Sequence, residues 1–245
     1  MRIALAALGF VNGDTPRNLQ TILTLMAQYA GQADLVLFGE AFLQGFDAAN
    51  FEPAHDRSVA LTLVDPDILR IREAARQHCI AVSFGFIEQD EPLFYSAQLT
   101  IDQSGVIANH YRRVSPGWKL PHAGAEYREG EGFSAFTLFG KRCVLGLCGD
   151  LWYEENIAAI RRLAPDVVLW PVYTDYSADE WNATEKLEYA EQAGRLGADV
   201  LYVNPVRLDR SSDENAFGGA AHFLGGQIAA DLPAGREGVL IVELA

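Results

Sequence analysis

Two segments of the sequence place one reactive side chain where an apolar run ends. Glu40 follows the run LVLF (35–38), and Cys148 closes the run VLGLC (144–148). Sites in α/β proteins tend to be built where strands end and loops begin. Each residue also has a plain structural interpretation, because a carboxylate past a strand is often only a loop residue and a cysteine in an apolar run is often an inert small hydrophobe. For Cys143, we favour the inert interpretation alone.

A polar stretch rich in glycine and proline, residues 114–132, lies between these two segments. Arg113 stands directly before it, and it contains Lys119 and Glu126. Basic residues in a surface loop are usually solvated, so none of them alone predicts a site. Together, however, a carboxylate, a cation and a thiol form a complete acyl-transfer set, with a base for the thiol, a nucleophile and an oxyanion partner. The stretch itself is either a functional loop or a linker.

The charge balance disfavours two classes of partner. The 245 residues carry 33 acidic against 19 basic side chains, a net charge of −14. Nucleic acids and anionic membrane surfaces normally bind basic faces, so we expect neither as a partner. No run approaches the roughly 18 apolar residues of a membrane span, which favours a cytoplasmic protein. The opening MRIALAALGFVNG resembles a signal-peptide core, but we interpret it as a buried first strand because it lacks a clear cleavage site.

Metals, cofactors and disulfides find no support in the spacing of the candidate residues. Three cysteines are too few for a disulfide framework, no CxxC pair exists, and the five histidines are scattered. No GxGxxG or P-loop follows any predicted strand. We therefore expect no metal and no cofactor.

Strand and helix patterns alternate along the chain, which predicts an α/β fold. We expect helices at residues 14–29, 67–78, 155–163 and 178–196, and strands at 3–8, 35–38, 80–88, 96–102, 106–113, 133–140, 141–148, 167–172, 200–206, 221–230 and 238–244. So many strands favour a four-layer α-β-β-α sandwich of two mixed sheets flanked by helices, in one domain spanning 1–245. A doubly wound single sheet is the alternative.

The chemically interesting segments resemble, in order, the motifs of the nitrilase superfamily, the carbon–nitrogen hydrolases with a Glu-Lys-Cys catalytic set. LVLFGEAFLQGF resembles the family's strand that ends in Pro-Glu, with Glu40 at the glutamate. SGVIANHYRR resembles the strand that ends in Tyr-Arg-Lys, with Arg113 where the lysine belongs. GLCGDLWYEE resembles the cysteine strand end, with Cys148 and Asp150 matching and Gly149 replacing a tyrosine. The resemblance covers nearly the whole chain.

The resemblance implies a cysteine amidohydrolase acting on a small linear amide. Glu40 would be the base, Cys148 would form a thioester, and Glu126 aligns with the second glutamate that many members place beside the lysine. The cation is open between two residues: Lys119, reaching in from the loop, is our first choice and Arg113 our second. Arginine stays protonated, so Arg113 would hold an oxyanion without relaying protons.

Other interpretations remain beside this one. The missing lysine also fits a catalytically impaired member that binds a metabolite or serves as a scaffold, and acyl transfer to an amine differs from hydrolysis only in the acceptor. Trp118, Trp152 and Tyr173 are candidates for substrate binding, although core or rim packing explains aromatic residues equally well. Gly149 offers room and an N–H for the oxyanion. The family usually forms dimers, so we expect a homodimer.

Overall fold

The computed structural model describes residues 1–209 and 215–245 and contains two six-stranded mixed sheets. The first sheet has the order β14 (Gly238–Glu243), β1 (Arg2–Ala7), β3 (Leu35–Phe38), β4 (Ala81–Asp90), β5 (Leu93–Ile101) and β6 (Ile107–Arg112). The second has the order β13 (Gln227–Leu232), β12 (Ala220–Leu224), β10 (Asp199–Val203), β9 (Val167–Pro171), β8 (Lys141–Leu145) and β7 (Ala135–Leu138). In each sheet three neighbouring strands are parallel, namely β1, β3 and β4 in the first and β8, β9 and β10 in the second. A short parallel pair, β2 (Gly9–Phe10) and β11 (Val206–Arg207), lies apart from both.

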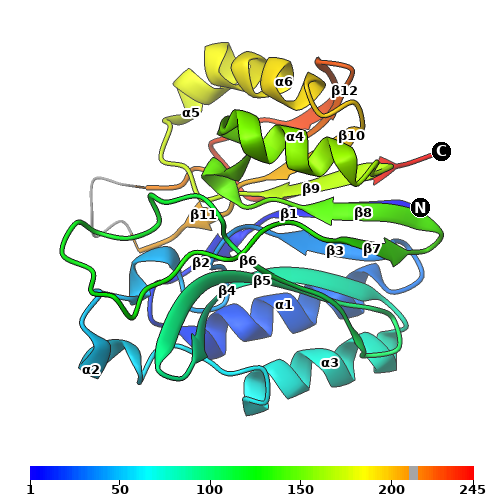
Figure 1. Ribbon diagram of the computed structural model, residues 1–245. Helices are drawn as coiled ribbons and strands as arrows, with labels where there is room; N and C mark the ends of the chain where they lie inside the picture. The colour runs from blue at the N-terminus through cyan, green and yellow to red at the C-terminus, as the bar shows by residue number, and fades with distance from the viewer. Residues whose placement is uncertain (210–214) are drawn as a thin grey trace.

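Helices cover the outer face of each sheet (Figure 1). The first sheet carries α1 (Thr15–Tyr29) and α3 (Pro66–His78), and the second carries α4 (Glu154–Arg162) and α6 (Lys186–Gly194). Two shorter helices, α2 (Pro53–Asp56) and α5 (Ala178–Glu180), lie near the left edge in this view. The start of α1 follows from its sequence, because the Asp14 side chain accepts a hydrogen bond from the Arg17 amide at 3.2 Å and a proline stands in the first turn.

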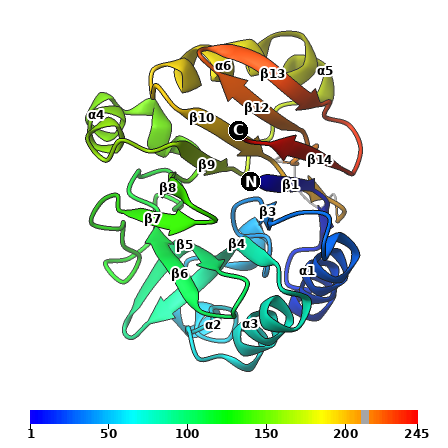
Figure 2. The same cartoon turned by 90° about the vertical axis from the view of Figure 1, so that its right-hand side faces the viewer.

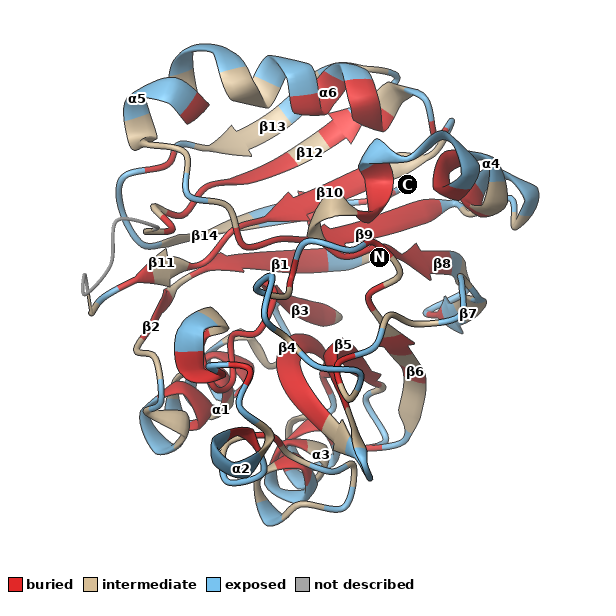
Figure 3. Ribbon diagram, turned by 60° about the vertical axis from the view of Figure 1, so that its left-hand side comes forward, coloured by how far each residue is buried: buried red, intermediate tan, exposed pale blue. Residues whose placement is uncertain are grey.

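The four-layer sandwich is confirmed, and the doubly wound single sheet is not the fold of this chain. Alternate side chains of β1 enter different cores: Ile3 and Leu5 lie between the two sheets, whereas Ala4 and Ala6 lie under the helices of the first sheet. Strands covered on both faces need apolar residues at every position, which explains runs such as LVLF. Figure 2 shows the two sheets face to face, and Figure 3 shows buried strands between helices whose outer faces are exposed.

The polar stretch 114–132 packs onto the rest of the molecule, so the linker interpretation is wrong. Its backbone is fixed to β5, because the Phe94 amide donates to the Glu126 carbonyl at 2.8 Å and the Arg128 amide donates to the Phe94 carbonyl at 3.0 Å. Trp118 and Tyr127 pack with Phe94 in a separate apolar cluster at this end of the molecule. The loop therefore forms a wall over the ends of β4 and β5.

Several expected elements differ from the structure. The single strand expected at 221–230 is two antiparallel strands, β12 and β13, because the chain turns at residues 225 and 226. The strand expected at 200–206 ends at Val203. The strand expected at 141–148 ends at Leu145, so Cys148 lies in a 3₁₀ turn (Cys148–Trp152) rather than on the strand. The helix expected at 178–196 is interrupted by a π turn (Trp181–Glu185), where Trp181 is buried and stacks on Tyr202 at 4.4 Å. Among the residues described, no helix is both long and apolar enough to cross a bilayer.

Candidate active site

Glu40 lies just beyond β3 at the point where the two sheets meet. Its side chain is fully buried, and its amide donates to the Val172 carbonyl, just past β9 of the second sheet, at 3.1 Å. Gly85 of β4 packs directly beneath this turn: a Cβ atom there would lie 2.2 Å from the Ala41 nitrogen and 2.7 Å from the Glu40 backbone. Only glycine permits so close an approach of two backbones. The backbone of the turn that carries Glu40 therefore packs directly against β4.

Arg113 lies one residue beyond β6, and its buried guanidinium faces Glu40. The Nη1 atom donates to Oε1 and Oε2 of Glu40 at 3.0 and 3.3 Å. The Nε atom donates to the Ser115 hydroxyl at 3.1 Å, and Nη2 donates to the Pro116 carbonyl at 3.3 Å. Ser96 of β5 donates a further hydrogen bond to Oε1 of Glu40 at 2.8 Å. These charge-assisted bonds hold the arginine in one orientation.

Cys148 occupies an unusual backbone conformation in the turn after β8. Its φ is +44°, in the left-handed region that non-glycine residues seldom adopt. The turn is held from the second sheet, because the Trp170 indole donates to the Cys148 carbonyl at 2.8 Å. The thiol donates to the Tyr173 carbonyl at 3.4 Å. A strained residue fixed in this way is typical of functional positions, since the surrounding structure has to maintain it.

The charges of Glu40 and Arg113 both act on the thiol, which brings the three residues into one site. The pKa of Cys148 is raised to about 12, chiefly by burial; the positive charge of Arg113 opposes this rise, and the charge and hydrogen bonding of Glu40 add to it. Burial alone would lower the pKa of Arg113, but the negative charges of Glu40 and the Cys148 thiolate raise it above its ordinary value. At neutral pH the site therefore holds a protonated thiol that needs a base, beside a permanent cation.

Asp150 ties the loop after β6 to the turn after β8. One carboxylate oxygen accepts the amides of Ser115 and Val114 at 2.6 and 3.2 Å, and the other accepts the Tyr111 hydroxyl at 2.5 Å and the Leu147 amide at 2.8 Å. The residue is fully buried, and burial raises its pKa. Because the bonds reach both segments, Asp150 sets the distance between the arginine and the cysteine.

Gly149 provides the space that the guanidinium occupies. A Cβ atom at this position would lie 2.9 Å from Arg113 Nη2 and 3.2 Å from the Ser115 hydroxyl oxygen. A tyrosine, which the resembling motif carries here, has no room over this arginine. The two departures from the motif, Arg113 for lysine and Gly149 for tyrosine, are therefore neighbours in space.

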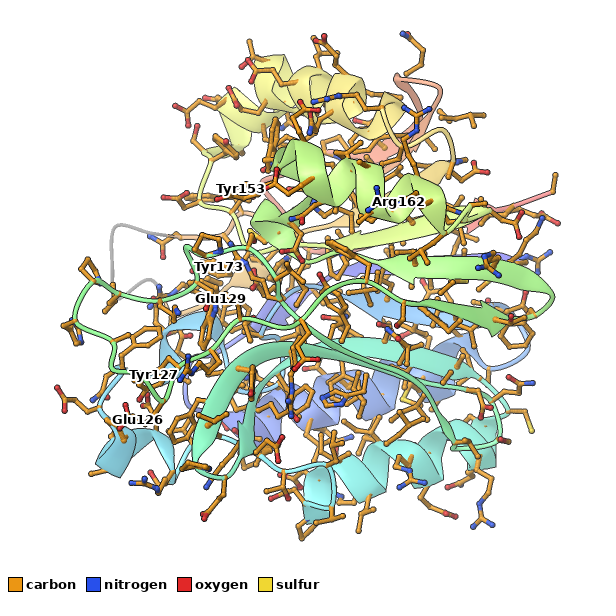
Figure 4. The ribbon with its side chains drawn as sticks, in the orientation of Figure 1. Glu126, Tyr127, Glu129, Tyr153, Arg162 and Tyr173 are labelled. Atoms are coloured by element: carbon orange, nitrogen blue, oxygen red, sulfur yellow. The ribbon has the colours of Figure 1, made fainter. Side chains whose placement is uncertain are left out.

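The structure does not bring Lys119 or Glu126 to this group. The Lys119 ammonium lies 2.5 Å from a Glu129 carboxylate oxygen and donates to the Tyr127 carbonyl at 3.1 Å. Glu126 extends beside Gly124, and Figure 4 shows it at the outer end of the loop near α2. Within the part of the chain that the structure describes, neither side chain has a hydrogen bond or ion pair with Glu40, Arg113 or Cys148.

The three aromatic candidates take different positions. Tyr173 is buried, supplies the carbonyl that accepts the thiol, and stacks its ring on Phe46 at 4.4 Å with an interplanar angle of 2°. Trp118 is buried in the loop wall. Trp152 is 42% exposed, and its ring packs edge-on against Tyr189 on the outer side of the second sheet.

Three further residues shape the site without having been singled out in the sequence. Ser96 binds the Glu40 carboxylate and Ser115 binds the Arg113 guanidinium. Asn204, after β10, accepts from the Thr174 amide at 3.1 Å and donates to the Thr174 carbonyl at 2.9 Å, which fixes the segment that carries the Tyr173 carbonyl. In the sequence, Ser96 and Asn204 can be noticed as polar residues within or directly after an apolar strand, in SAQLTID and VLYVNPV.

Comparison with known proteins matches nearly the whole chain to one family. The family model described as carbon-nitrogen hydrolase matches residues 2–245. An (R)-stereoselective amidase from Pseudomonas sp. is 29% identical over 236 residues, which cover 96% of this chain and 79% of the amidase. A cyanide hydratase from Armillaria gallica is 33% identical over 106 residues, and this chain spans only 30% of its length.

Solved structures show the same fold at lower identity. An amidase from Nesterenkonia sp. superposes with a TM-score of 0.79 at 23% identity, over 100% of this chain and 90% of that protein. A variant of the Nesterenkonia sp. AN1 amidase shows the Michael addition of acrylamide at its active-site cysteine; its TM-score to this chain is 0.79 at 23% identity, over 100% of this chain and 93% of that protein.

Proposed function

The chain belongs to the carbon–nitrogen hydrolase family, and from that premise we propose that it hydrolyses a small linear carboxamide through a thioester on Cys148. In this proposal Glu40 is the general base and Arg113, rather than Lys119, is the cation. The observation that carries it is the buried guanidinium, which binds Glu40 at 3.0 Å and lowers the pKa of the neighbouring thiol while burial raises it. An amide is the substrate class because a relative that is 29% identical over 96% of this chain is an amidase.

The first half of the reaction forms the thioester. Glu40 accepts the thiol proton as the Cys148 sulfur attacks the amide carbon, and the carbonyl oxygen becomes an oxyanion. Arg113 and the backbone N–H of Gly149 stabilise this charge. When the tetrahedral intermediate collapses, the C–N bond breaks, Glu40 returns its proton to the nitrogen, and ammonia or an amine leaves.

The second half releases the acid. Glu40 removes a proton from a water molecule, the hydroxide attacks the thioester carbon, and the thiol leaves with the proton returned to it. Because arginine does not give up its proton at working pH, every proton transfer in this scheme falls to Glu40. The oxyanion is proposed to bind the same guanidinium that binds Glu40. The Glu40–Arg113 pair therefore has to separate during turnover far enough for the oxyanion to reach Arg113.

The test combines turnover with direct detection of the intermediate. Incubate the protein with acetamide, propanamide and butanamide, measure ammonia release, and look for an acyl adduct by intact mass. We expect turnover and an adduct that disappears in Cys148→Ala but persists in Cys79→Ala, a matched change at an exposed cysteine. Acrylamide serves as a second probe, since it adds to the active-site cysteine of the Nesterenkonia amidase.

The identity of the cation is tested separately. Arg113→Lys keeps the charge beside Glu40, so the fold survives while the hydrogen-bonding geometry is lost, and we expect kcat to fall by about 10²–10³-fold. Lys119→Ala is expected to change kcat by less than about threefold, because its partner Glu129 is partly exposed. The reverse pattern refutes Arg113 as the cation. Binding of an amide without turnover, unchanged in Cys148→Ala, establishes the alternative of a non-catalytic binding protein.

A further inference from the structure

Ser96 contacts both members of the buried Glu40–Arg113 pair. Its hydroxyl donates to Glu40 Oε1 at 2.8 Å, and its backbone carbonyl accepts the Arg113 amide at 2.9 Å. The residue lies within β5 and is only 4% exposed, so strand pairing fixes its backbone. Side chains on strands are positioned more precisely than side chains on loops. Ser96 therefore gives the Glu40 carboxylate a fixed partner.

Three buried polar side chains, Ser96, Gln98 and Thr100, lie on the same face of β5. Such side chains are unfavourable in a protein interior unless they are hydrogen-bonded. Gln98 Nε2 donates to the carbonyl of Phe38 at 3.2 Å, at the end of β3, just before the turn that carries the proposed base. Thr100 donates at 3.0 Å to a serine of β4 and does not contact that turn. Two of the three side chains therefore bind the segment of Glu40, and the third serves as a comparison.

The two carboxylate oxygens of Glu40 differ in their hydrogen bonds. Oε1 accepts from the Ser96 hydroxyl at 2.8 Å and from Arg113 Nη1 at 3.0 Å, whereas Oε2 accepts the longer bond from the same Nη1 at 3.3 Å. Each carboxylate oxygen offers about two lone pairs. In the described part of the chain, both lone pairs of Oε1 are therefore used, and one of Oε2 remains for a proton.

The titratable groups that face Glu40 are Arg113, from the loop after β6, and Cys148, from the turn after β8. Hydrogen bonding between the carboxylate and the thiol helps to raise the pKa of Cys148, which is consistent with a proton shared along this line. The proposed reaction draws Arg113 toward the oxyanion. The bond from Ser96 is then the one that stays on the carboxylate through both halves of the reaction.

We propose that Ser96 is a positioning residue that holds Oε1 of Glu40, so that Oε2 takes the proton of the Cys148 thiol and passes it to the leaving nitrogen. The same oxygen then removes a proton from the attacking water and returns it to the sulfur when the thioester breaks. The Ser96 hydroxyl keeps its own proton throughout. The inference rests on the proposed amide hydrolysis and assigns its proton transfers to one oxygen atom.

The experiment compares the pH dependence of kcat/KM for propanamide in the wild-type protein and in Ser96→Ala. At low pH the catalytic base is protonated and kcat/KM falls, which gives the profile an acidic limb. Loss of a hydrogen bond to the ionised carboxylate favours the protonated form, so this limb should move to higher pH by about one unit or more. Above the limb, kcat/KM should still be lower by about tenfold or more, because the carboxylate is less well oriented.

Thr100→Val is the matched control. It removes a hydroxyl from the same face of the same strand, and this hydroxyl has no bond to Glu40. We expect its acidic limb to coincide with that of the wild-type protein, whatever stability both variants lose in thermal unfolding.

An unshifted acidic limb in Ser96→Ala overturns the inference. An equal shift in Thr100→Val also overturns it, because the shift would then come from a general loss of packing. In both cases turnover of propanamide leaves the proposed hydrolysis standing. If no amide is turned over by the wild-type protein and Cys148 is never acylated, the proposed function fails and the inference fails with it.

Discussion

Replacing Gly149 with alanine tests whether the guanidinium of Arg113 is the working cation. The φ of Gly149 lies outside the left-handed region, so alanine introduces no backbone strain there. The added methyl carbon would lie 2.9 Å from Arg113 Nη2, which is closer than a carbon and a nitrogen atom normally approach without a bond. Since the guanidinium is held by Glu40, Ser115 and the Pro116 carbonyl, it moves only by weakening those hydrogen bonds.

The expected loss of kcat/KM in Gly149→Ala is estimated from the hydrogen bonds of Arg113 that the methyl group would weaken. Hydrogen bonds to charged groups contribute about 1.5–3 kcal/mol. At about 1.4 kcal/mol per factor of ten, loss of one such bond in the transition state lowers kcat/KM by about 10–150-fold. Arg113→Lys removes the Nη2 atom altogether, so the alanine methyl then meets only the Ser115 hydroxyl, at 3.2 Å. In that background we expect Gly149→Ala to cost no more than about twofold.

The assay is a double-mutant cycle on ammonia release, with thermal unfolding measured for all four proteins. Gly124→Ala is the matched control, because a Cβ atom there meets only the carboxylate of Glu126, which is free to swing into solvent. We expect the control to match the wild-type protein. If Gly149→Ala lowers kcat/KM equally in the arginine and lysine backgrounds, the contact with Arg113 is not the cause, and the assignment of the cation from this geometry is refuted.

Three further predictions concern the charges and the packing around the site. Burial raises the pKa of Cys148, and the charge of Glu40 raises it further. Glu40→Gln should therefore speed alkylation of Cys148 by iodoacetamide at about pH 8 while lowering amide turnover by about 10²–10⁴-fold. Slower alkylation would contradict this reasoning. Gly85→Ala places a methyl group 2.7 Å from the Glu40 backbone. It should lower the free energy of unfolding, measured in urea, by about 3 kcal/mol or more. A change below about 1 kcal/mol would be evidence against this close packing. Burial alone would raise the pKa of Glu88, but hydrogen bonding to Arg112 lowers it below the usual 4.5. The Glu88 carboxylate therefore stabilises the fold above pH 4.5, and this contribution to the free energy of unfolding is lost as the pH falls through the lowered pKa. Glu88→Gln should flatten this part of a curve of stability against pH.

Much of the architecture could be predicted because it depends on local patterns. The capped start of α1 and the run LVLF are signals of a helix and of a strand covered on both faces, and both elements appear where they were expected. The order of Glu40, a cation and Cys148 along the chain also indicated the groups of the proposed acyl-transfer set. Local patterns sufficed here because each motif lies at the end of one strand.

The choice between the two cations could not be made from the sequence. Lys119 has the residue type that the family motif requires, but its position depends on how a loop folds over β5 and on the partner that Glu129 provides. Ser96 posed a similar problem. The alternation in SAQLTID suggests a strand with one face toward water, yet Ser96 is buried and donates a hydrogen bond to the Glu40 carboxylate. The sequence marks Ser96 only as a polar residue in an apolar strand; its partner is decided by long-range packing, which local spacing does not encode.

The proposed site is divided between the two sheets: Glu40 and Arg113 follow strands of the first, and Cys148 follows a strand of the second. The interface between the sheets is an apolar core in which residues such as Leu37 and Leu145 interlock. A slip of a single residue along a strand would move one sheet by about 3.3 Å and separate the acid from the sulfur. If these residues act as proposed, activity depends on how the two sheets are aligned with each other. Substitutions in that core, remote from any substrate, are expected to appear as losses of kcat before they appear as losses of fold.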